Sequence, residues 1–105
     1  MEGEEGLVPG ELQIPPSVVS DKNARELVRA WVAHGGLQCS LNVGTWKDDQ
    51  EQIGWGILLS DIARHIADAL YQSKHADKDQ TLSKIRAVFN SELNGPTAET
   101  QGKFV

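Results

Sequence analysis

The stretch WGILLSDIARHIADAL at residues 55–70 limits the fold more narrowly than any other part of the sequence. At about 100° per residue, its large apolar side chains fall within one stripe roughly 80° wide, which predicts an amphipathic helix with one buried face. This stripe must share a core with the rest of the chain. Its members are Trp55, Leu59, Ile62, Ile66 and Leu70.

Two more helices are predicted from the same kind of spacing. Ser20 is a good N-cap and the Gly35-Gly36 pair is a good stop, so the apolar residues between them predict a helix over residues 20–34. A last helix is expected at residues 79–93, before an Asn-Gly-Pro sequence that ends it. The expected buried stripes are Ala24, Leu27, Val28, Trp31 and Val32 in the first of these helices, and Leu82, Ile85, Phe89 and Leu93 in the last.

One strand is expected at residues 37–43, LQCSLNV, because apolar and polar side chains alternate there. Cys39 belongs to the inward set and is interpreted as a small buried hydrophobic residue rather than a nucleophile. A lone strand cannot satisfy its backbone groups, so it needs a partner strand. The first choice is ELQIP at residues 11–15, and the alternatives are the C-terminal KFV at residues 103–105 or the same strand of a second subunit.

The predicted fold class is therefore α+β, with three amphipathic helices packed on one face of a small antiparallel sheet. A chain of 105 residues is long enough for one domain, which is expected at residues 11–95. Residues 1–10 carry charge and glycine with few apolar side chains, which predicts a disordered leader. Residues 96–105 are expected to form an irregular tail.

Charge and cysteine content exclude several classes of protein. Ten basic against fifteen acidic side chains give a net charge of −5, and the basic ones are interspersed with acids, so neither duplex nucleic acid nor an anionic membrane is expected as a partner. The longest strongly apolar run, residues 57–59, is far shorter than the roughly 20 residues of a membrane span. A single cysteine and the acidic start MEGEEG predict a cytoplasmic protein without a disulfide framework.

Asp61, Arg64 and His65 place three ionisable side chains in five positions of the predicted helix at residues 55–70. The first interpretation is a solvent-exposed helix face, on which Arg64 pairs with Asp61 three residues back and with Asp68 four residues ahead. Ile57 falls on the same side, so the face is not purely polar, and another segment or another chain could cover it.

The second interpretation is a binding site for a small anion. Asp61 would orient His65, and Arg64 would hold a carboxylate or phosphate, with Trp55 or Trp46 at the mouth of the site. A catalytic site would also need a nucleophile, metal ligands or oxyanion donors, and none can be placed from the sequence. The acids between residues 48 and 51 lack the glycine and glutamate of a calcium loop. No catalytic residue, metal or cofactor is therefore predicted.

Several motifs spread along the chain resemble one family of small bacterial proteins. They are ELQIPP at residues 11–16, the Glu26, Arg29 and Trp31 set, WGILLSDIARHIA at residues 55–67, Phe89 with Glu92, and Pro96-Thr97 before Gly102. The family is a domain of unknown function found chiefly in alphaproteobacteria, and the resemblance spans nearly the whole chain after residue 10. It implies a free-standing cytoplasmic domain and implies no activity or site residues.

These observations predict a non-enzymatic interaction module, with a protein partner or a second copy of the chain as its binding partner. It would present either the edge of its sheet or the helix face that carries Asp61 and Arg64. The alternative hypothesis is a protein that binds a small anionic ligand, or a minor enzyme, that uses Asp61, Arg64 and His65.

Overall fold

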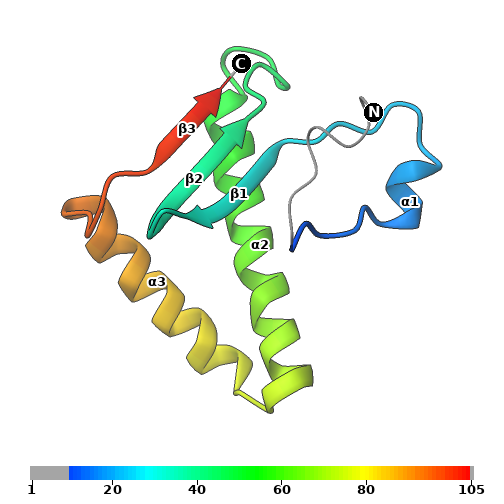
Figure 1. Ribbon diagram of the computed structural model, residues 1–105. Coiled ribbons are helices and arrows are strands. Elements are labelled where there is room, and N and C mark those ends of the chain that lie inside the picture. Colours follow the sequence, from blue (N-terminus) through cyan, green and yellow to red (C-terminus); the bar gives the residue numbers. More distant parts are fainter. Residues whose placement is uncertain (1–9, 105) are drawn as a thin grey trace.

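The computed structural model describes residues 10–104 of the chain and has an α+β architecture, which confirms the predicted fold class (Figure 1). The expected leader at residues 1–10 lies outside the described residues except for Gly10. In chain order the elements are α1 (Pro16–Val19), β1 (Val28–Ala33), β2 (Gly36–Leu41), α2 (Glu51–Lys74), α3 (Lys78–Asn94) and β3 (Gln101–Phe104).

Strands β1 and β2 form an antiparallel hairpin in which Val28 lies opposite Leu41 and Ala33 lies opposite Gly36. The two residues between the strands, His34 and Gly35, both have positive φ angles of 54° and 74°. Two consecutive positive φ angles are typical of a type I′ turn, whose twist matches that of a hairpin. A two-residue turn of this kind sets the register of the whole pair.

The helix predicted over residues 20–34 is therefore wrong. Ser20 ends the one-turn helix α1 instead of starting a longer one, and β1 occupies the second half of the predicted helix. The apolar residues of this segment satisfy two periodicities at once, because Val28, Ala30 and Val32 also alternate as a strand requires. Pairing with the neighbouring strand satisfies the backbone of both segments, and this tertiary contact decides between the two.

The third strand comes from the C-terminal segment. β3 runs parallel to β2, with Gly102 opposite Cys39, so the sheet is mixed rather than antiparallel. ELQIP at residues 11–15, the first choice for a partner strand, is not in the sheet, and the C-terminal alternative is correct for residues 103–104. Residues 96–105, expected to be an irregular tail, thus contain a strand.

Gly102 allows β3 to approach β2 closely. It has a φ of 137°, and an added Cβ there would overlap the carbonyl oxygen of Cys39.

The helical hairpin α2 and α3 agrees with the sequence prediction. His75 ends α2 in the left-handed conformation, and its backbone N–H donates to the carbonyl of Tyr71 at 3.0 Å. Asp77 caps α3 by accepting a hydrogen bond from the backbone N–H of Asp79 at 2.9 Å. Among the described residues, no helix has the length and apolar character needed to cross a membrane.

The chain returns from α3 to the sheet through a polar clamp at Glu92. Its carboxylate accepts hydrogen bonds from the backbone N–H of Thr97 at 3.0 Å and from the Thr97 hydroxyl at 2.7 Å. The backbone hydrogen bond, and then the hydroxyl, lower the pKa of Glu92. This clamp closes the turn after α3 and directs the chain toward β3.

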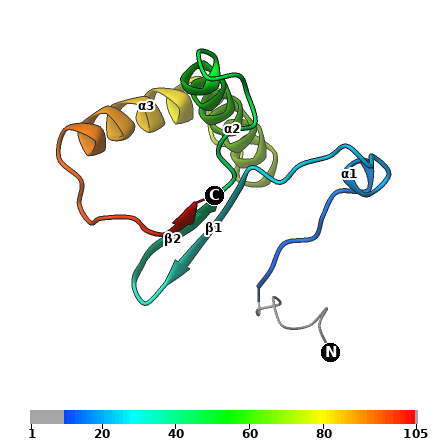
Figure 2. The same ribbon diagram turned by 90° about the horizontal axis from the view of Figure 1, so that it is seen from above.

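The helices and the sheet do not close into one core. α2 contacts α3, and β2 contacts both other strands, but within the described residues the helices do not pack closely against the sheet (Figures 1 and 2). Ala67 is the only hydrophobic residue of the described chain that is buried. In the stripe predicted as the core face of α2, Leu59, Ile62 and Ile66 are each more than 40% exposed. A single copy of the chain therefore leaves this stripe largely uncovered.

Candidate functional site

An open groove of about 670 Å³ lies between α2 and the chain that leads into β1. Asp61 and His65 line it from α2, and Arg25 lines it from the opposite side. The structure thus brings together two of the predicted site residues and adds a cation that the sequence analysis missed. The apolar wall includes Leu27, Val28, Leu58, Ile62 and Ile66.

Arg25 could be found only once the neighbouring strand was known. In the predicted helix over residues 20–34, Arg25 lies outside the apolar stripe, where an arginine is ordinary. Because β1 begins at Val28, Arg25 instead belongs to the extended segment that faces α2 across the groove.

Arg64 lies outside the groove. The ion pairs expected with Asp61 and Asp68 do not form among the described residues. Asp68 instead pairs with Lys78 of α3 at 3.1 Å, and the Lys78 ammonium lies 5.1 Å from the centre of the Tyr71 ring. An exposed pair of this kind contributes at most about 1 kcal/mol, so its main effect is to orient the start of α3 on α2.

Trp55, expected at the mouth of the groove, does not line it. Its indole is instead held by Glu51, which lies one helical turn earlier in α2. The Glu51 carboxylate accepts a hydrogen bond from the Trp55 indole N–H at 2.7 Å and from the backbone N–H groups of Gly44 at 3.0 Å and Trp46 at 3.1 Å. The hydrogen bond from Gly44, followed by those from Trp55 and Trp46, lowers the pKa of Glu51 from its ordinary value of 4.5, against an opposing effect of desolvation.

Trp46 is the indole that lines the groove. Its ring meets that of Trp55 edge to face, with centroids 5.7 Å apart, and it covers Gly54, which is buried. A Cβ added to Gly54 would lie 2.5 Å from the Trp46 ring. The glycine therefore makes the space that lets Trp46 close one end of the groove.

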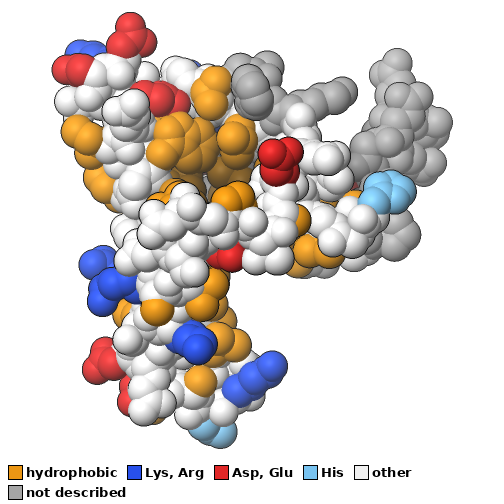
Figure 3. Space-filling view, turned by 90° about the vertical axis from the view of Figure 1, so that its left-hand side faces the viewer, with side chains coloured by type: hydrophobic (Ala, Val, Ile, Leu, Met, Phe, Trp, Pro, Cys, Tyr) orange, Lys and Arg blue, Asp and Glu red, His pale blue; other side chains and the backbone are white. Residues whose placement is uncertain are grey.

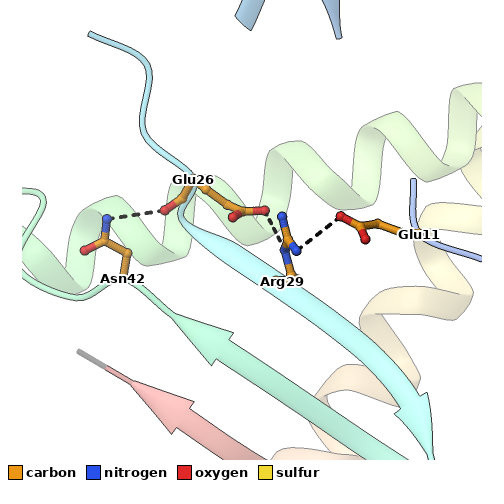
Figure 4. Close-up of polar contacts among 4 residues, drawn as sticks. All are labelled: Glu11, Glu26, Arg29 and Asn42. Carbon is orange, nitrogen blue, oxygen red and sulfur yellow. Dashed lines mark hydrogen bonds and ion pairs between the residues drawn. The ribbon is translucent and has the colours of Figure 1, made fainter. Parts of the chain in front are cut away.

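A second cavity of about 610 Å³ lies between β1 and the segment at residues 10–15. Arg29 of β1 joins the two sides, since its guanidinium contacts Glu26 at 2.9 Å and Glu11 at 3.4 Å (Figure 4). The hydrogen bond to Glu26 is the largest cause of the raised pKa of Arg29. The Asn42 side chain donates to the Glu26 carbonyl at 3.3 Å. This network anchors the N-terminal segment beside the sheet.

The described residues contain no group of three histidine, cysteine or carboxylate side chains that could hold a metal ion. Cys39, the single cysteine of the sequence, is half-buried in β2 and carries a free thiol. Asp61 and His65 are both exposed. The groove combines an apolar wall with a few charged groups at its margin, a composition common in ligand-binding surfaces.

Comparison with known proteins identifies a family, and it finds solved structures that resemble this chain. A model of the family described as "Domain of unknown function (DUF5076)" matches residues 11–97. A solved structure from the photosynthetic bacterium Rhodopseudomonas palustris, provisionally named a pyruvate dehydrogenase, is similar with 34% sequence identity and a TM-score of 0.64. The similarity covers 88% of this chain and 91% of the other. No curated protein matches the sequence.

Two glycines of α2 test whether Trp46 packing shapes this end of the molecule. We expect Gly54→Ala to lower the free energy of unfolding by about 1 to 3 kcal/mol, because the added methyl group overlaps the Trp46 ring. Gly56→Ala is the matched control: no atom lies within 4 Å of its added Cβ, so it should stabilise the helix by up to about 1 kcal/mol. Urea denaturation at one protein concentration measures both, and equal effects would contradict the packing.

The lowered pKa of Glu51 predicts a specific loss of stability in acid. A depressed pKa in the folded state stabilises the protein above the ordinary value of 4.5, and this contribution disappears as the pH falls through the lower folded value. Glu51→Gln should therefore be less stable than the wild type at neutral pH, and the gap should narrow in acid. Denaturation of both proteins and of the exposed-site control Glu99→Gln measures it. A gap that stays constant with pH would show that the charge of Glu51 has no role.

Proposed function

The chain belongs to the DUF5076 family of domains of unknown function, and from this premise we propose that it is a protein-interaction module that acts by binding. The observation that carries the proposal is the amount of apolar surface that the chain leaves open. Two surfaces contribute to it, one on the sheet and one on the helical hairpin.

The open sheet surface is the face formed by the alternating residues Val28, Ala30 and Val32 of β1 with Leu37 and Cys39 of β2. Val28 lines the groove with α2, so this face is turned toward the helices at its near end. Its far end is uncovered: Val32 is 83% exposed and Leu37 is 43% exposed. A strand face this apolar is normally covered by another layer of structure.

The open hairpin surface consists of apolar side chains of α2 and α3 that remain exposed when the two helices pack together. Its main members are Leu59 of α2 and Phe89 and Leu93 of α3. On α3, exposure increases away from the turn, from the half-buried Leu82 and Ile85 to Phe89 at 45% and Leu93 at 70%. Figure 3 shows hydrophobic side chains gathered around a hollow on one face of the molecule.

Exposed apolar surface of this extent favours association with another protein. Each Å² of apolar surface removed from water contributes roughly 25 cal/mol, and isolated soluble domains seldom leave large contiguous patches open. A partner would therefore present apolar side chains of its own to the open sheet and hairpin surfaces. The exposed Asp61 and Arg64 would lie at the margin, where charges set orientation more than affinity.

Affinity enrichment with three baits tests this function. The tagged wild-type chain should retain a protein partner from a lysate of its source organism in near-stoichiometric amount. Val32→Glu places a charge in the open sheet surface and should lose that partner. Gln72→Glu adds the same charge at an exposed position outside the apolar stripe of α2 and should keep it. Identical recovery with all three baits would rule the proposal out, and so would a wild-type chain that retains no protein and is also monomeric.

A second candidate function is the binding of a small carboxylate in the groove. Arg25, Asp61 and His65 line its margin, and Arg25 carries the charge that a carboxylate requires. The name of the Rhodopseudomonas relative includes pyruvate, a small carboxylate with an apolar methyl group, which makes pyruvate a natural probe. Arg64, expected from the sequence to hold the anion, has no part in this version of the site.

Titration with pyruvate, followed by amide NMR shifts, tests this second function. Shifts should centre on Arg25, Asp61 and His65, and Arg25→Gln should weaken binding about tenfold, because a charge-assisted hydrogen bond is lost. Arg64→Gln is the control and should bind like the wild type. If neither variant changes the titration, or if millimolar pyruvate moves no signal, the groove is not a carboxylate site.

A further inference from the structure

We propose that the partner is a second copy of this chain, arranged so that the helical hairpin of each copy covers the open sheet surface of the other. This inference rests on the proposed function and names the occupant of its binding surface.

One copy exposes far more surface than a closed domain of its size. Its accessible area is 9232 Å², whereas a folded monomer of 11.5 kDa exposes about 5,800 Å². The ten residues outside the described part could add about 1,600 Å² at most, even if fully extended, so roughly 1,800 Å² of excess remains. The radius of gyration of 15.9 Å likewise exceeds the value of about 13 Å for a compact chain of this length.

This excess is of the size that a permanent dimer buries. Part of the excess lies on the N-terminal segment, where Leu12, Ile14 and Val19 are exposed, so roughly 1,800 Å² per copy is an upper bound. Two copies would bury at most about 3,600 Å² in total, against the range of about 2,000 to 5,000 Å² typical of obligate homodimers. Such interfaces resemble a domain core cut in half, which is the condition of the open sheet and hairpin surfaces here. Residues 1–9 contain only Met1, Leu7 and Val8 as large apolar side chains, too few to cover both surfaces.

A second copy fits better than an unrelated protein, because the chain itself carries both an apolar sheet face and an apolar helical face that could cover one another. The open sheet surface needs an apolar helical layer, and the open hairpin surface needs an apolar partner layer. Both lie on one chain, yet they do not pack closely against each other. A two-fold axis would satisfy both at once, since the contact of hairpin on sheet then occurs twice in the dimer.

The charge of the chain indicates how such a dimer should respond to salt. Each copy carries a net charge of −5, so two copies repel each other weakly, while Val32, Leu37, Phe89 and Leu93 are uncharged. Salt screens the repulsion and does not weaken apolar contacts. Association should therefore persist or strengthen at high salt, which distinguishes it from pairing through ionic contacts.

Sedimentation equilibrium of the purified full-length chain tests whether a second copy binds. We expect twice the chain mass of 11.5 kDa at micromolar concentration, in low and high salt alike. Val32→Glu should raise the dissociation constant roughly a hundredfold or more, because it would bury a charge, and Gln72→Glu should leave it unchanged. A wild-type chain that stays monomeric at all concentrations would overturn the inference. The proposed function would still stand if the wild-type bait retained a different protein and Val32→Glu lost it.

Cross-linking between singly substituted copies tests the arrangement, in a Cys39→Ser background that removes the native thiol. Copies with Val32→Cys are mixed with copies carrying Leu93→Cys, so any bond between the two sites joins two molecules. A short thiol cross-linker should link this mixture, whereas a mixture of Gln72→Cys and Leu93→Cys should give no product. Linkage among Val32→Cys copies alone, with none in the mixture, would place the second copy at the edge of β1 and overturn the reciprocal arrangement.

Discussion

The hydrogen bonds accepted by Glu51 determine how the sheet is joined to the helices. Gly44 and Trp46 lie in the connection that leaves β2, and Trp55 lies one turn further along α2, so a single carboxylate ties the connection to the start of the helix. Trp46 then rests on Gly54. Because the sheet and the helices do not pack closely along their lengths, this junction and the Glu92 clamp before β3 set their relative position.

The sheet and the helical hairpin are two apolar layers that do not pack closely against each other in a single copy. The sheet has one apolar face, the helical hairpin has apolar stripes, and a single copy leaves most of both in water. Hydrophobic burial is the main favourable contribution to folding, so covering the open surfaces would stabilise the chain. In the proposed dimer, stability and function are two consequences of one contact, and stability would depend on protein concentration.

The groove between Arg25 and α2 lies beside the Val28 end of the open sheet surface. Val28 belongs both to the groove wall and to the open sheet surface, so a partner that covers the sheet would also approach Asp61 and His65. A carboxylate in the groove and a protein on the open surfaces would therefore influence each other. By linkage, each would change the affinity of the other by the same factor.

The sequence by itself determined the elements whose evidence is local. The stripe at residues 55–70, the last helix and the alternation at residues 37–43 all predicted structure correctly, because periodicity and caps act within one segment. Only the tertiary structure decided the rest. Residues 28–33 fit a helix and a strand equally well until β2 pairs with them, and Arg25 joins Asp61 and His65 only because that strand begins where it does. Whether an apolar stripe is covered depends on which layers meet in space, and a pattern along one chain does not contain that information.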